Sequence, residues 1–331
     1  MERFALAAAV VLGFALTAAL CSLFVPLRRV LERREQQQQP VQSEQPRLAP
    51  LRAPLWGGLC AAAGTVAAVG VGWLAACVGQ PELLGSEGRL MTRLLTALAG
   101  SLAFGAVGLA EDVARMRSPA ALGLRRDVRL LLEALAAAFV LLLLRAAGCL
   151  PRGLGVPGAG YVLLGSAVPF LWAVLMVALA ECARVAERDE GTVCGAAFVA
   201  MLALMMVEAG LGVSGLAVLP AALAGALVAL GLWAFPPARL GAGCCGSLLA
   251  AGAIGCIPLS LDMTSLTVPL ALPFWAAGGL LAAQLLCAKR TGKPLRCWVK
   301  KHKMSPETVF LCSFALSAVG YVLALALLRW C

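Results

Sequence analysis

Charged residues are scarce in this sequence. Only 13% of its 331 residues are charged and 6% are aromatic, whereas 61% are hydrophobic and the mean hydropathy is +0.91. A soluble domain is only about half apolar. The shortage of charge therefore argues against an ordinary soluble domain and predicts an integral membrane protein.

Paired cysteine motifs are also absent. The 13 cysteines lie mainly inside apolar segments and form no Cys-x-x-Cys pair, so we expect small apolar side chains and neither a disulfide framework nor a zinc site. The net charge of +10 reflects membrane topology and does not indicate a nucleic-acid partner.

Long apolar runs fill most of the chain. Runs of about 18 residues or more predict helices that span a membrane. Together they predict an all-α polytopic membrane protein that forms a single domain over 1–331. We count ten such runs, at 3–26, 56–78, 94–110, 130–149, 161–180, 191–211, 213–235, 241–260, 264–287 and 307–329.

The basic residues lie almost entirely on one side of these segments. Alternate loops hold 21 of the 27 Lys and Arg residues, and basic loops face the cytoplasm. This predicts a multi-pass protein with both termini outside and a site on the cytoplasmic face. Few charges lie inside the segments, which argues against a channel or a solute transporter.

Two adjacent acids, Glu111 and Asp112, end the third apolar run and are followed by Arg115 and Arg117. Acids at the edge of a low-dielectric segment cost free energy and are usually functional, and the arginines suit phosphate oxygens. The other interpretation is a helix that simply stops at the water interface. The pair alone does not decide between the two.

A second charged stretch covers 181–191, where four acids and two arginines lie between two apolar segments. Residues 181, 184, 187 and 191 share a helical face at 3.6 residues per turn. Either a binding site or ordinary ion pairs on a helix surface would explain this spacing.

The motifs and their order resemble those of the polyprenyl-phosphate N-acetylhexosamine-1-phosphate transferase superfamily. Within it, the phospho-N-acetylmuramoyl-pentapeptide transferases are most similar. The family's Gly-Thr-Pro-Thr-Met-Gly-Gly falls on Arg52 to Gly58, its Gly-Phe-x-Asp-Asp-x-x-Lys falls on Gly108 to Arg115, and its Lys-Leu-Leu-Leu-Gln falls on Arg129 to Glu133.

Three further motifs keep their spacing while their chemistry changes. The family's Asn-x-x-Asn-x-x-Asp-Gly-x-Asp-Gly falls on 181–191, and its Pro-Ala-Lys-x-Phe-Met-Gly-Asp-x-Gly-Ser falls on 237–247 without gaps. Its Pro-x-His-His-His block falls on 294–298, where Arg296, Cys297 and Trp298 replace the histidines.

The resemblance implies a reaction in the bacterial cytoplasmic membrane. A phospho-N-acetylmuramoyl-pentapeptide, or another phospho-N-acetylhexosamine, moves from a UDP carrier to undecaprenyl phosphate in cell-envelope synthesis. The implied catalytic residues are Glu111, Asp112 and Glu187, and the implied ligands of a Mg²⁺ cofactor are Asp112 and Glu187.

The resemblance also implies how phosphate and partners are bound. Arg115, Arg129, Glu190 and Arg296 correspond to residues that hold phosphates or substrate. The implied partners are undecaprenyl phosphate, a UDP-linked amino sugar and membrane lipid, and a homodimer is compatible with the family.

One departure bears on activity. The aspartate that binds Mg²⁺ in the family is Cys244 here, and a thiol is a poor ligand for a hard cation. We therefore expect activity to be reduced or lost. Two hypotheses remain open. One is a working transferase with an altered site, and the other is a non-catalytic paralogue of the enzyme that binds lipid phosphate or has a regulatory role.

Overall fold

The structure, a computed structural model, is almost entirely helical. It describes residues 2–38, 56–79, 88–117, 123–151, 153–156, 160–163, 165, 167–187, 191–235, 239–291 and 306–330. The helices and strands are α1 (Glu2–Gln38), α2 (Gly57–Gly79), α4 (Gly88–Arg117), α5 (Arg126–Ala146), β1 (Gly153–Val156), β2 (Gly160–Leu163), α6 (Ala167–Ala186), α7 (Thr192–Gly210), α8 (Ser214–Ala234), α9 (Gly243–Ser260), η1 (Thr264–Leu266), α10 (Thr267–Leu270), α11 (Leu272–Thr291) and α13 (Pro306–Trp330).

Each of the ten predicted segments corresponds to a helix or to a bent helix pair, which confirms the all-α membrane fold. Within the described ranges, eight helices are long and apolar enough to cross a membrane, and the bent pair of α10 and α11 makes up to nine. The remaining segment is α5, which is long enough to cross a membrane but is not counted because it carries charged residues that include Arg129, Glu133 and Arg145.

The structure corrects two predicted boundaries. Residues 161–163, placed in a spanning helix by their hydropathy, belong to β2 (Gly160–Leu163) of a short antiparallel hairpin, and α6 begins only at Ala167. The third segment does not end at 110, because α4 continues as a helix to Arg117. Glu111 and Asp112 therefore lie inside a helix and do not terminate it.

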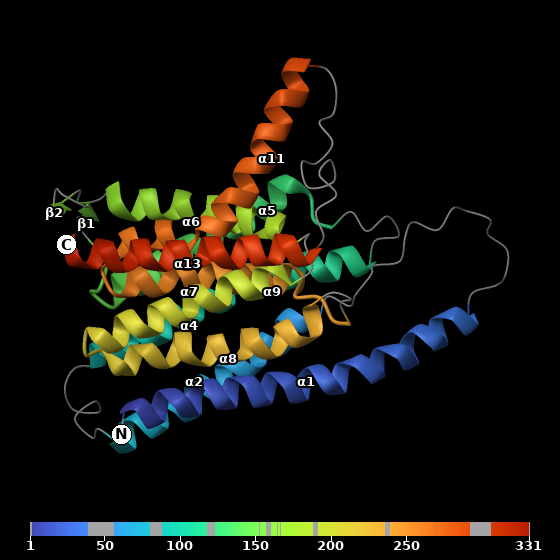
Figure 1. Cartoon of the computed structure of the whole chain (residues 1–331), viewed down its shortest axis with the longest axis horizontal. Helices are drawn as coiled ribbons and strands as arrows, with labels where there is room; N and C mark the ends of the chain where they lie inside the picture. Colours follow the sequence, from blue (N-terminus) through green and yellow to red (C-terminus); the bar gives the residue numbers. More distant parts are fainter. Residues whose placement is uncertain are drawn as a thin grey trace.

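The ninth predicted segment is broken near Ala271, where η1 and α10 meet α11 at an angle of 64°. Pro273 lies at the second position of α11. A proline ring clashes with the carbonyl four residues earlier and has no N–H to donate, which favours a break or kink at 269–273. In Figure 1, α11 leans away from the other helices after this break.

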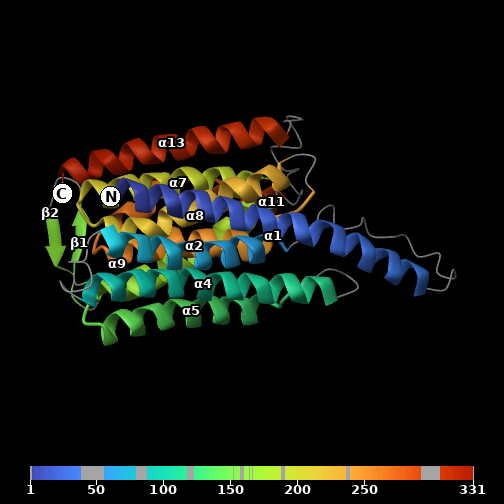
Figure 2. The same cartoon turned by 90° about the horizontal axis from the view of Figure 1, so that it is seen from below.

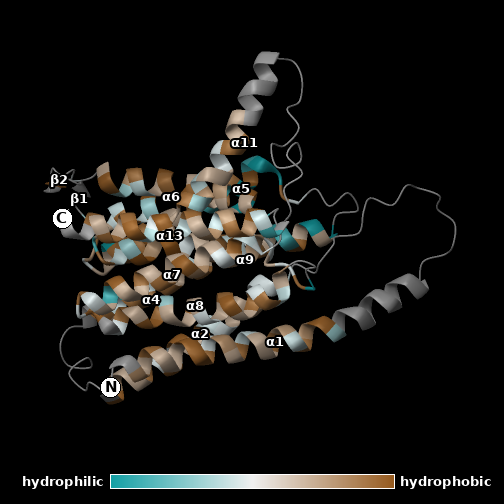
Figure 3. Ribbon diagram, in the orientation of Figure 1, coloured by the Kyte–Doolittle hydropathy of each residue, from teal (hydrophilic) through white to brown (hydrophobic). Residues whose placement is uncertain are grey.

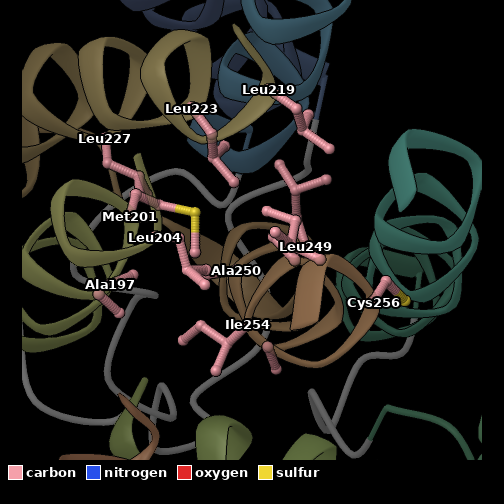
Figure 4. Close-up of a cluster of buried hydrophobic side chains, with 14 of the residues drawn as sticks. Ala197, Met201, Leu204, Leu219, Leu223, Leu227, Leu249, Ala250, Ile254 and Cys256 are labelled. Atoms are coloured by element: carbon pink, nitrogen blue, oxygen red, sulfur yellow. The ribbon is translucent and has the colours of Figure 1, made fainter. Parts of the chain in front are cut away.

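The centre of the bundle is α9, whose eighteen residues are all buried. Its Gly, Ala and Cys residues let neighbouring backbones approach closely. Figure 4 shows Leu249, Ala250 and Ile254 of α9 among buried side chains of α7 and α8. By contrast, α13 lies on the outside, as Figure 2 shows, and only 17% of its spanning window is buried.

The two termini lie at one end of the bundle, whereas α4 ends and α5 begins at the other (Figures 1 and 2). Figure 3 shows the hydrophilic residues of both helices gathered there. The termini are thus on the same side of the bundle.

Both α4 and α2 come very close to α9, at Gly108 and Gly58. A Cβ on Gly108 would overlap the carbonyl group of Cys244, and one on Gly58 would overlap the backbone nitrogen of Gly246. These glycines let α2 and α4 lie directly against the first turn of α9.

We predict that Gly108→Ala destabilises the protein. Forcing an extra methyl group against backbone atoms costs about 1–3 kcal/mol, so the melting temperature in detergent should fall. Gly70→Ala is the matched control, because a Cβ there meets nothing within 4 Å, and its melting temperature should be unchanged or slightly higher. Equal melting temperatures for the two variants would contradict this packing.

Candidate active site

Five of the seven predicted site residues converge where α4, α5, α6 and α9 meet at the charged end of the bundle. Glu111, Asp112 and Arg115 come from α4, Arg129 comes from α5, and Glu187 follows α6 directly. The start of α9 closes this region, because α4 packs along α9 more extensively than against any other helix.

Asp112 holds the N-terminus of α9. The backbone N–H of Cys244 donates to Oδ1 of Asp112 at 3.0 Å, and that of Cys245 donates to Oδ2 at 2.8 Å. The first N–H groups of a helix have no partner within it, and a negative charge is stabilised there by the helix dipole. Asp112 is 1% exposed, so these two bonds also satisfy a carboxylate that water does not reach.

Glu111 lies among three guanidinium groups that come from three different helices. Its Oε1 accepts a hydrogen bond from Arg115 Nη2 at 2.8 Å, and it lies 3.6 Å from Arg129 Nη1 and 3.9 Å from Arg184 Nη1. Glu111 is 2% exposed. A buried carboxylate needs such partners, because a charge removed from water is otherwise very costly.

Glu181 joins two of these arginines. It accepts from Arg129 Nε at 2.8 Å and from Arg184 Nη2 at 2.6 Å. The resulting group of Glu111, Arg115, Arg129, Glu181 and Arg184, called here the arginine–carboxylate network, links α4, α5 and α6 by charge-assisted hydrogen bonds and ion pairs.

Glu187 and Cys244 lie at the edge of this network. Glu187 Oε2 is 3.6 Å from Arg115 Nη1, and the thiol of Cys244 points at the same oxygen, with a long sulfur–oxygen distance of 4.0 Å. Burial raises the pKa of the Glu187 carboxyl above its ordinary value, although Arg115 opposes the shift. Glu187 therefore keeps its proton to a higher pH than a free glutamate does.

The structure adds residues to the site that were not assigned to it from the sequence. Arg184 and Glu181 belong to the network, and the spacing of charges at 181, 184 and 187 along one helical face was the signal for them. Glu133 of α5 is fully buried, and neither of its carboxyl oxygens has a hydrogen-bond partner in the described structure. Gly123, with a φ of 69°, passes close to Arg115, which its lack of a side chain allows.

Two predicted site residues, Glu190 and Arg296, lie outside the residues that the structure describes. Their assignment to substrate or phosphate remains a prediction.

A magnesium site needs several free oxygen ligands in octahedral geometry, and these residues fit that requirement poorly. Both oxygens of Asp112 accept from α9, and Oε1 of Glu111 faces three guanidinium groups. Cys244 offers a soft sulfur. Over the ranges that the structure describes, no three His, Cys, Asp or Glu side chains are grouped so as to hold a metal ion.

The described structure is a multi-pass membrane bundle with paired acids and arginines gathered at one end, and guanidinium groups suit the binding of phosphate oxygens. The sequence matches the model of the family described as glycosyl transferase family 4 over residues 94–262, which is just over half of the chain and includes every helix of the network. The chain therefore belongs to glycosyl transferase family 4.

This membership supports the assignment to the polyprenyl-phosphate N-acetylhexosamine-1-phosphate transferase superfamily, and with it phospho-sugar transfer to a polyprenyl phosphate as the general chemistry. A search of the curated proteins finds no match to the chain.

We predict that Asp112→Asn destabilises the start of α9. An amide at this position presents only one acceptor oxygen to two backbone N–H groups and carries no charge, and an unsatisfied buried donor costs about 1–3 kcal/mol. The free energy of unfolding should fall by that amount, and hydrogen exchange should accelerate at the amides of Cys244 and Cys245.

The matched control is Asp127→Asn, because Asp127 is exposed in the first turn of α5. It should change stability by less than about 0.5 kcal/mol. Unchanged exchange at Cys244 and Cys245 in Asp112→Asn would show that Asp112 does not hold α9.

Proposed function

We propose that this chain is a homologue of phospho-N-acetylmuramoyl-pentapeptide transferase in the bacterial cytoplasmic membrane. Its transfer of the phospho-sugar from the UDP carrier to undecaprenyl phosphate, with release of UMP, is strongly reduced or lost. The family match and the retained spacing of the motifs support the transferase ancestry.

The proposed loss of activity rests mainly on the cysteine at position 244. It stands where the resemblance places the magnesium-binding aspartate, and it is buried at the N-terminus of α9. A thiol there supplies neither the charge nor the hard oxygen that Mg²⁺ requires.

The acids that remain are also less available for chemistry than free carboxylates. Asp112 caps α9 with both oxygens, and Glu111 is engaged by Arg115. A general base must reach the proton that it removes within hydrogen-bond distance. Asp112 can act as a base only if it gives up a bond to the α9 backbone.

The second candidate, a protein that binds lipid phosphate without transferring the sugar, is favoured by Arg115. Its side chain is 20% exposed, the largest fraction among the three arginines of the network. A guanidinium group at the edge of the site can bind phosphate oxygens in bidentate fashion. Binding would then persist where turnover does not.

We predict that Cys244→Asp increases transfer. Purified protein is incubated with Mg²⁺, undecaprenyl phosphate and radiolabelled UDP-N-acetylmuramoyl-pentapeptide, and labelled lipid is extracted. The unaltered chain should be at least about 100-fold slower than a family member with the full motif, since small errors in catalytic geometry already cost that much.

Cys244→Asn controls for the change in size without adding charge, and it should gain nothing. Native mass spectrometry with undecaprenyl phosphate separates a slow transferase from a protein that only binds lipid phosphate. Retained binding without turnover supports the binding protein. Turnover by the unaltered chain at the rate of an ordinary family member would overturn the proposed loss of activity.

A further inference from the structure

In the arginine–carboxylate network, three guanidinium groups lie within 4 Å of one carboxylate oxygen. Oε1 of Glu111 faces Arg115 at 2.8 Å, Arg129 at 3.6 Å and Arg184 at 3.9 Å. These side chains are 20%, 8% and 15% exposed, so solvent screens them far less than it screens a surface ion pair.

The network also comes close to neutrality without any added ion. The three guanidinium groups and two carboxylates of the network carry a net charge of +1. Glu187, which lies beside Arg115, and Asp112, which accepts two hydrogen bonds from the α9 backbone, bring the sum to −1 when both are ionised. Buried charges are tolerated when they are paired in this way, so these carboxylates already have their counterions.

Little room for a divalent cation is left. Both oxygens of Asp112 and Oε1 of Glu111 are engaged, whereas Oε2 of Glu111 and both carboxyl oxygens of Glu133 have no hydrogen-bond partner in the described structure. Over the described ranges these acids are not grouped with a third possible ligand so as to hold a metal ion, and Mg²⁺ demands a near-octahedral oxygen shell. A dication bound to Oε2 of Glu111 would also lie close to three guanidinium groups, and like charges at short range repel strongly.

We infer that Arg115, Arg129 and Arg184 supply the positive charge of this site in place of a divalent metal ion. The inference rests on the proposed function, since it concerns the same phosphate-handling site. This arrangement suits a phosphate or diphosphate. Such a ligand would displace Glu181 and Glu111 and bind the guanidinium groups in their place. Such binding needs no metal.

The test measures metal binding directly and does not depend on turnover. The full chain, purified in detergent and stripped with EDTA, is titrated with Mn²⁺ while the electron paramagnetic resonance signal of free Mn²⁺ is recorded. For the unaltered chain, free Mn²⁺ should follow total Mn²⁺ throughout the titration, and Mg²⁺ should leave the melting temperature unchanged.

The double variant Cys244→Asp with Arg184→Asn supplies an oxygen ligand and removes one guanidinium group. It should bind about one Mn²⁺ per chain, with an affinity more than about 100-fold higher than that of the unaltered chain. Changes to outer-shell partners alone alter metal affinity by up to about 100-fold. The matched control is Cys244→Asp with Arg145→Asn, because Arg145 lies in the last turn of α5, far from the network. It should bind Mn²⁺ more weakly than the first double variant.

Two results would overturn the inference. One is stoichiometric Mn²⁺ binding by the unaltered chain that disappears in Asp112→Asn. The other is equal Mn²⁺ affinity in the two double variants, both folded by size-exclusion chromatography and helical circular dichroism. Neither result depends on transferase activity, so the proposed loss of turnover stands or falls separately.

Discussion

The N-terminus of α9 imposes the constraint on which the rest of this end of the bundle depends. Because every residue of α9 is buried, its first N–H groups cannot be satisfied by water and must find partners inside the protein. Asp112 provides two of those bonds from a neighbouring helix. The requirement fixes α4 against α9 in one axial register, and the glycine at 108 makes the approach sterically possible.

That register also decides where the remaining charges lie. Glu111 directly precedes Asp112, so α4 turns it towards α5 and α6, where Arg129 and Arg184 reach it. Each charge in the network is the counterion of another, and the network therefore stabilises the packing of three helices at the same time as it shapes a site. Removing one partner leaves an uncompensated buried charge, which is more costly than losing an ordinary contact.

Much of the fold could be predicted from the sequence, because long apolar runs have few alternatives in a membrane. Hydropathy does not reveal the hairpin of β1 and β2, because the apolar residues of β2 continue the hydropathy of α6. Pro273 is the sequence signal for the break near Ala271. The site was partly predictable. Charge spacing placed Glu187 near the arginines, and motif order placed Cys244 beside the acids. The pairing of Glu181 with Arg129 could not be inferred, since it depends on how α5 and α6 pack.

The two thiols at the start of α9 carry a practical consequence. Cys244 and Cys245 are buried under the network, whereas Cys312 of α13 is exposed on the outside of the bundle. A maleimide reagent modifies a thiol only when it can reach the thiolate. Cys312 lies inside the apolar span of α13 and faces lipid or detergent, so it is not a water-accessible reference. Label at Cys244 or Cys245 therefore requires the start of α9 to open to water.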